Sequence, residues 1–138
     1  MDKVRAEVLD YDARTSKVRA DEARLRERMA ELDDKIYTNQ KAGVDLLRAV
    51  LVEDVRRFLA RLVEVRVRSR LIQPHHDKKV SAYGRLLEAY ETLLKAYPAE
   101  DFDAVRAGLE QKAKAAQELE AADQQIRRLL VKYRSSGT

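Results

Sequence analysis

The sequence predicts an all-α protein in which long antiparallel helices form an elongated, coiled-coil-like bundle that is completed by dimerisation. Two observations carry this prediction. The chain of 138 residues is 38% charged and has only four Gly, two Pro and no Trp, which is typical of long helices. Its apolar residues recur at alternating spacings of four and three, as in amphipathic helices that share narrow seams. The length suits one elongated helical domain over residues 1–138.

The first helix is predicted over residues 2–37. Two polar residues, Thr15 and Glu22, interrupt its seam. The other seam positions are Val4, Val8, Tyr11, Val18, Leu25, Met29, Leu32 and Ile36.

The second helix is predicted over residues 43–73. The preceding segment YTNQKAG weakens the seam, but a helix tolerates Gly at a cost of about 1 kcal/mol. The pattern therefore leaves open a tight turn or one continuous helix through residues 37–43. Over Val63–Arg68 valines alternate with charged residues, which is a strand period. That alternation is short, no partner strand is in sight and an isolated strand is unstable, so we expect a helix that ends near Gln73, before Pro74.

The last two helices are predicted over residues 78–97 and 101–134. Pro98 separates them, and Asp101 is the expected N-cap of the last one. Lys112 and Asp123 are weak points in its seam. Tyr83, Tyr90 and Tyr97 stand at heptad spacing and are interpreted as core residues rather than as a platform for stacked bases.

The predicted helix 43–73 carries two apolar stripes. The first holds Leu51, Val55, Phe58, Leu62, Val65 and Ile72, and the second holds Val52, Leu59, Val63 and Val67. Because a single antiparallel partner covers only one stripe, we expect a bundle of three or more helices. The second stripe needs a further helix, from this chain or from a second copy, and in the second case it is the interface of a homodimer.

The net charge of +4 is confined to the middle of the chain. Residues 42–79 hold nine bases and five acids, whereas residues 1–41 hold ten of each and residues 80–138 hold nine of each. Such local asymmetry attracts anionic partners. The other interpretation is an arginine-rich helix face that contacts only water.

Several classes of function are unsupported by the sequence. There is no Cys, which excludes disulfides and thiol chemistry. His75, His76 and Asp77 have no second cluster that would complete a metal site, and a solvent-exposed turn is the expected setting. We find no phosphate-binding glycine loop and no nucleophile elbow, and predict a non-enzyme with no catalytic residues, metal or cofactor. No apolar run approaches the length of a membrane span, and no signal peptide is recognised. A cytoplasmic protein, including one peripheral to a membrane, is expected.

Two short runs resemble a known family. Val8–Arg14 (VLDYDAR) looks like the run that opens a long helix in BAR domains, and Glu53–Phe58 (EDVRRF) is similar to a run in the last helix of sorting-nexin-type members. The aromatic-bearing run Tyr83–Leu94 follows at about the expected distance. The first long helix of such domains has no counterpart, and residues 101–134 form an extra helix.

The resemblance to the BAR superfamily, including its sorting-nexin and amphiphysin branches, implies a crescent-shaped homodimer that binds anionic membrane. The basic patch at residues 48–79 would then bind lipid, with these candidate residues: Arg56, Arg57, Arg61, Arg66, Arg68, Arg70, Lys78 and Lys79. The alternative is a coiled-coil adaptor or scaffold that binds a protein partner of a cytoskeletal or secretion-apparatus assembly. Nucleic acid is ranked last, because no known nucleic-acid-binding motif is present.

Overall fold

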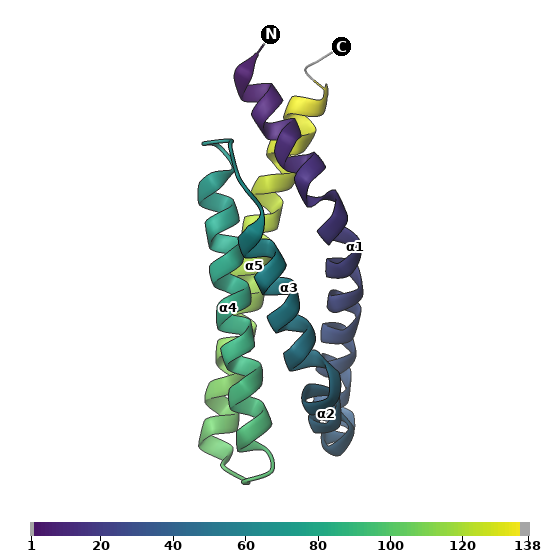
Figure 1. Ribbon diagram of the computed structural model, residues 1–138. Helices are drawn as coiled ribbons and strands as arrows, with labels where there is room; N and C mark the ends of the chain where they lie inside the picture. The colour runs from purple at the N-terminus through teal and green to yellow at the C-terminus, as the bar shows by residue number, and fades with distance from the viewer. Residues whose placement is uncertain (1, 136–138) are drawn as a thin grey trace.

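The computed structural model describes residues 2–135, which form an elongated helical bundle (Figure 1). No strand occurs among these residues, so the predicted all-α class is confirmed. The elements are the helices α1 (Lys3–Thr38), α2 (Gln40–Leu46), α3 (Val52–Glu64), α4 (Gln73–Ala96) and α5 (Phe102–Ser135), and a π-helical turn η1 (Leu47–Leu51) that joins α2 to α3.

Neighbouring helices run antiparallel. Between α1 and α3, Arg28 pairs with Asp54 and Asp21 pairs with Arg61, so the partner positions run in opposite order along the two helices. The same reversed order links α4 to α5 and α1 to α5. The chain therefore passes four times along the bundle, and the second pass consists of α2, η1 and α3.

The two ends of the bundle are built from different parts of the chain. One end, which we call the terminal end, holds the start of α1, the segment between α3 and α4, and the last turns of α5 (Figure 1). The opposite end, the junction end, holds the α1–α2 turn and the α4–α5 turn (Figure 1). Segments far apart in sequence thus meet at the terminal end.

A tight turn at Asn39 separates α1 from α2 and settles the alternative that the sequence left open. The backbone of Asn39 leaves the helical region, and its side-chain oxygen accepts a hydrogen bond from the N–H of Ala42 at 3.2 Å. Gly43 lets α2 fold back closely on α1, because a Cβ there would lie 3.0 Å from the Ile36 side chain.

The π-helical turn η1 links α2 to α3 without a break in the rod. The N–H of Val52 donates to the carbonyl of Leu47, five residues earlier. Leu47 and Leu51 are both fully buried. A wide turn of this kind changes the phase of a helix, and here it brings the start of α3 onto the core.

The predicted helix 43–73 is wrong beyond Glu64. α3 ends there, Val65 has extended backbone angles, and residues 65–69 are not helical. In this extended segment Val65, Val67 and Ser69 turn inward, whereas Arg66 and Arg68, together with Arg70 in the turn that follows, are exposed. The alternation that looked like a strand marks extended backbone without a sheet. Extended chain places every second side chain on one side, which lets both valines pack against the buried cluster that includes Val8 and Ile72.

α4 begins at Gln73, five residues before the predicted start. Pro74 lies in its first turn, where the missing N–H of proline costs no helical hydrogen bond. The start of α5 follows the prediction more closely, and Asp101 accepts a hydrogen bond from the N–H of Ala104 at 3.2 Å, which confirms its role as N-cap. Gly108 keeps α5 close to α4, since a Cβ there would lie 2.9 Å from Leu93.

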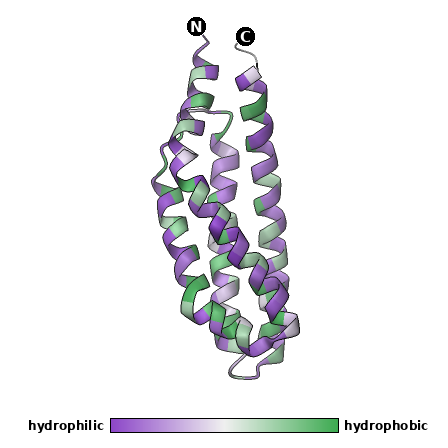
Figure 2. Cartoon of the chain, turned by 90° about the vertical axis from the view of Figure 1, so that its right-hand side faces the viewer, coloured by the Kyte–Doolittle hydropathy of each residue, from purple (hydrophilic) through white to green (hydrophobic). Residues whose placement is uncertain are grey.

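The core has two parts. A main cluster runs along all the helices and includes Phe58, Tyr83, Tyr90 and Tyr97, which confirms the core role predicted for the three tyrosines. A smaller terminal cluster joins Val8 and Tyr11 of α1, Ile72, and Ile126 and Leu130 of α5. Apolar and polar positions are interleaved along each helix (Figure 2), and within residues 2–135 no helix is apolar over a membrane-spanning length.

Candidate functional site

The predicted basic patch is divided by the fold, and its α3 part is largely neutralised. Arg56 pairs with Glu53 at 3.0 Å and with Glu91 of α4 at 3.5 Å, and Arg57 pairs with Glu53 at 3.3 Å. Arg61 is hydrogen-bonded to Asp21 of α1. These three arginines remain exposed, but each of them shares its charge with a carboxylate.

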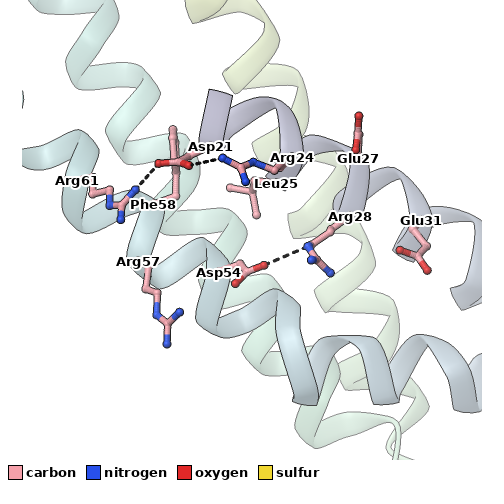
Figure 3. A pocket seen from close by; sticks show the side chains of 10 residues that line it. All are labelled: Asp21, Arg24, Leu25, Glu27, Arg28, Glu31, Asp54, Arg57, Phe58 and Arg61. Atoms are coloured by element: carbon pink, nitrogen blue, oxygen red, sulfur yellow. Dashed lines mark hydrogen bonds and ion pairs between the residues drawn. The ribbon is translucent and has the colours of Figure 1, made fainter. Parts of the chain in front are cut away.

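Arg57 and Arg61 line a groove of about 520 Å³ between α1 and α3 (Figure 3). Its charged lining is balanced: four arginines (Arg24, Arg28, Arg57 and Arg61) face four acids (Asp21, Glu27, Glu31 and Asp54). Ion pairs cross the groove at Arg28–Asp54 and Arg61–Asp21. A surface with equal numbers of both charges produces little net field, so this groove has no preference for anions.

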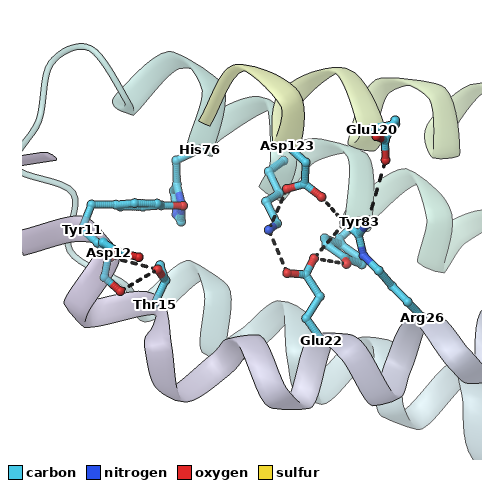
Figure 4. Close-up of polar contacts among 10 residues, drawn as sticks. Tyr11, Asp12, Thr15, Glu22, Arg26, His76, Tyr83, Glu120 and Asp123 are labelled. Atoms are coloured by element: carbon cyan, nitrogen blue, oxygen red, sulfur yellow. Dashed lines mark hydrogen bonds and ion pairs between the residues drawn. The ribbon is translucent and has the colours of Figure 1, made fainter. Parts of the chain in front are cut away.

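Lys79 is not a surface residue, which corrects its predicted role in contacting a membrane. Only 9% of it is exposed. Its Nζ lies 2.9 Å from Glu22 Oε1 and 2.9 Å from Asp123 Oδ1. Arg26 and the hydroxyl of Tyr83 complete the cluster by bonding to Glu22. Figure 4 shows this polar cluster between α1, α4 and α5.

The polar cluster is electrically balanced and structural in character. Two bases, Lys79 and Arg26, face two carboxylates, Glu22 and Asp123, and Arg26 bonds to both acids. Burial and the neighbouring Glu22 raise the pKa of Tyr83, so its hydroxyl stays protonated and donates. Each carboxylate is bonded to both bases.

The sequence contained a signal for this cluster. Glu22 and Asp123 interrupt the apolar seams of α1 and α5, and an acid at a seam position implies a buried partner. Which base would supply that partner was not readable, because Lys79 stands among several cations in one run. Only the packing of three helices selects it.

His76 is buried, which corrects the expected solvent-exposed turn. The hydroxyl of Tyr11 lies 2.9 Å from its Nδ1 (Figure 4). Burial lowers the pKa of His76, and Lys79 acts in the same direction, whereas Asp77 and the backbone of Leu62 oppose them. The neutral ring is therefore favoured. Among residues 2–135 no three His, Asp or Glu side chains are arranged to hold a metal ion.

The remaining cations of the patch lie at the terminal end. Arg66, Arg68 and Arg70 are exposed on the extended segment, and Lys78 is exposed in the first turns of α4. Within residues 2–135 none of the four forms an ion pair, in contrast to Arg56, Arg57 and Arg61. This group is the part of the predicted site that can attract an external anion.

The predicted interface residues do not form one continuous stripe. Val52 is buried within the chain, Leu59 is half-buried against the main cluster, and Val67 packs into the terminal cluster. Val63 alone is well exposed, at 60%. Val67 leaves the stripe because α3 ends at Glu64, whereas Val52, Leu59 and Val63 stay on α3 but differ in burial.

The last turns of α5 supply basic residues that the sequence analysis did not single out. Arg127, Arg128, Lys132 and Arg134 follow one another with no acid over residues 124–135. They were hidden because residues 80–138 as a whole are balanced in charge.

Comparison of the chain with known protein families, curated proteins and solved structures finds no match.

Proposed function

We propose that the chain is a non-enzymatic helical interaction module that binds anionic membrane surfaces through the basic residues of its extended segment. One observation carries the proposal. Arg66, Arg68 and Arg70 point outward from one short segment without a carboxylate partner among residues 2–135. Other candidate cations nearby, such as Arg56 and Lys79, are paired.

The spacing of these arginines suits a charged surface. In extended chain, alternate side chains lie about 6.6 Å apart on one side, so Arg66 and Arg68 stand in a short row, which Arg70 follows in the turn before α4. The inward valines anchor the row to the bundle. Each Lys or Arg held near an anionic lipid surface contributes about 1 kcal/mol. Three arginines and Lys78 together would give measurable but reversible association.

A protein-binding adaptor is the second candidate, and the exposure of Val63 favours it. At 60% exposed, Val63 lies beside the half-buried Leu59 near the end of α3. The homodimer predicted from the second stripe stays a prediction, and these two residues are where such a contact would now centre. Replacing both with Ser would abolish partner binding if the adaptor were the true function, and would leave vesicle binding intact under our proposal.

Vesicle co-sedimentation tests the proposal. The chain should sediment with vesicles of phosphatidylcholine and phosphatidylserine and stay in solution with phosphatidylcholine alone. Reversing three charges in the variant R66E/R68E/R70E should weaken binding at least about a hundredfold, since each arginine near the surface counts for about 1 kcal/mol.

The matched control reverses three exposed cations elsewhere. Lys41, Lys95 and Arg106 lie at or near the junction end, are exposed and form no ion pair among residues 2–135. The variant K41E/K95E/R106E has the same net charge as the test variant and should retain most of the binding. Equal loss in both variants would mean that only net charge matters, which would sink the proposed site.

A further inference from the structure

The terminal end gathers basic residues from two separate parts of the chain. Val65 and Val67 of the extended segment pack in the same terminal cluster as Ile126 and Leu130 of α5. Because these apolar side chains point inward, the intervening residues face outward at the same end. Arg66 and Arg68 are exposed on one segment, and Arg128 and Lys132 are exposed on the other.

The net positive charge of these two segments exceeds the net charge of the whole chain. Residues 65–72 and 124–135 together contain seven Lys or Arg and no acid, against a net charge of +4 for all 138 residues. Arg134 is held by Asp12 at 2.6 Å and Arg127 by Glu120 at 3.0 Å. Arg128 and Lys132 form no ion pair within residues 2–135, and the Lys132 Nζ lies 5.4 Å from the ring centre of Tyr133.

Exposed apolar side chains accompany these charges. Leu71 is 42% exposed beside Arg70, and Val131 is 62% exposed between Arg128 and Lys132. Isolated exposed apolar residues are common on protein surfaces. Here, however, each one adjoins a cation, Arg70 before Leu71 and Lys132 after Val131, and apolar residues beside cations are also found in segments that lie in the headgroup region of a bilayer.

The junction end has the opposite character. Residues 33–45 and 95–106 carry six acids and four bases, whereas residues 2–12, 65–76 and 124–135 at the terminal end carry nine bases and four acids. Because these two groups of residues lie at opposite ends of the bundle, the molecule is electrically polar along its long axis. Such a distribution orients a protein before it touches a charged surface.

We propose that the molecule meets an anionic lipid bilayer end-on, with the terminal end in the headgroups and the junction end away from the membrane. The last turns of α5 share in the contact, and Leu71 enters the interface. This inference rests on the proposed membrane function. It adds an orientation and a second contact segment, α5, to that function.

Single tryptophans test the orientation, because the chain contains none. Leu71→Trp places the reporter at the terminal end, and Phe102→Trp places it at the junction end, where Phe102 is 66% exposed. Vesicles of phosphatidylserine and brominated phosphatidylcholine should quench and blue-shift the L71W emission and leave F102W unchanged. Equal responses, or a larger response from F102W, would overturn end-on binding.

Charge reversal on α5 tests the second contact. R128E/K132E should weaken vesicle binding at least about tenfold, whereas K95E/R106E, with the same change in net charge, should not. Circular dichroism must show unchanged helix content in both variants. Full binding by R128E/K132E would remove α5 from the interface.

The outcomes separate the two proposals. If the unsubstituted chain fails to sediment with phosphatidylserine vesicles, both proposals fall. If it sediments while L71W and F102W respond alike, the membrane function stands and the orientation falls. Binding to duplex DNA as tight as to vesicles in the same buffer would overturn the choice of lipid as the partner.

Discussion

Lys79 links three helices by its charge. It bonds to Glu22 of α1 and to Asp123 of α5 from its place on α4, and it is almost completely buried. Moving such charges out of water is costly, and mutual attraction offsets that cost only while every partner is present. The cluster therefore favours one register of the three helices rather than adding much net stability.

Replacing Lys79 with Met should lower the free energy of unfolding by about 3 kcal/mol, since the two buried carboxylates would keep Arg26 as their only cation in the cluster. Urea denaturation followed by circular dichroism measures the change. The neighbouring exposed Lys78→Met should shift stability by less than about 0.5 kcal/mol. Wild-type stability in K79M would show that the cluster is not a structural requirement.

His76 gives the fold a dependence on pH. Its pKa lies below the ordinary value because the ring is buried, so the unfolded chain binds a proton at a higher pH than the folded one does. The stability contributed by the neutral ring is complete above about pH 6.5 and is lost as pH falls through the lowered pKa of the folded protein.

The free energy of unfolding should therefore decrease as the pH is lowered from about 7.5 to about 5.5. This range lies above the pH at which carboxylates ordinarily titrate. His76→Gln should flatten this slope in denaturation curves recorded across the range. His75→Gln is the control and should keep the slope, because the His75 side chain is only half-buried. An unchanged slope in H76Q would rule out His76 as its source.

At the scale of elements, the extended segment between α3 and α4 is the feature on which local pattern and structure disagree most. Residues 65 and 67 would point in different directions on a helix, about 200° apart. In extended backbone they point the same way, and both reach the terminal cluster. Both valines are partly buried there, which offsets some of the helical hydrogen bonds that the segment gives up.

Val67 and Val63 provide a matched pair of substitutions. Val67→Ser should destabilise the fold by about 1–2 kcal/mol, because a hydroxyl would enter an apolar cluster. Val63→Ser should have an effect below about 0.5 kcal/mol, since that side chain is mostly exposed. Thermal unfolding of the two variants measures both losses of stability. Equal losses would favour an uninterrupted helix through residue 67 over the extended segment.

At the scale of the whole molecule, the uneven charge of the two ends controls association. Attraction between a cationic end and an anionic bilayer is screened over about 10 Å at 0.1 M salt and about 3 Å at 1 M. Vesicle binding should accordingly fall steeply as salt is raised across this range. Binding that persists at high salt would instead indicate apolar contact, centred on residues such as Leu71 and Val131.

Much of the fold was predictable from the sequence. The 4-3 spacing set the all-α class and the approximate bounds of α1 and α5, because an apolar stripe along a helix follows from the backbone period alone. The N-cap at Asp101 was also predictable, because an N-cap depends only on the residues next to it in sequence. Glu22 and Asp123 were visible as interruptions, although their function was not.

Only the tertiary structure decided which base pairs with the acids that interrupt the apolar seams, and which cations remain unpaired. Lys79 and Arg66 both carry a positive charge and are near each other in sequence. Lys79 is nevertheless buried between two acids, whereas Arg66 is exposed. The terminal end likewise exists only because α1, the extended segment and α5 pack in one apolar cluster. Local patterns depend on a few neighbouring residues, whereas pairing and burial depend on contacts between segments more than a hundred residues apart, such as the ion pair of Asp12 and Arg134.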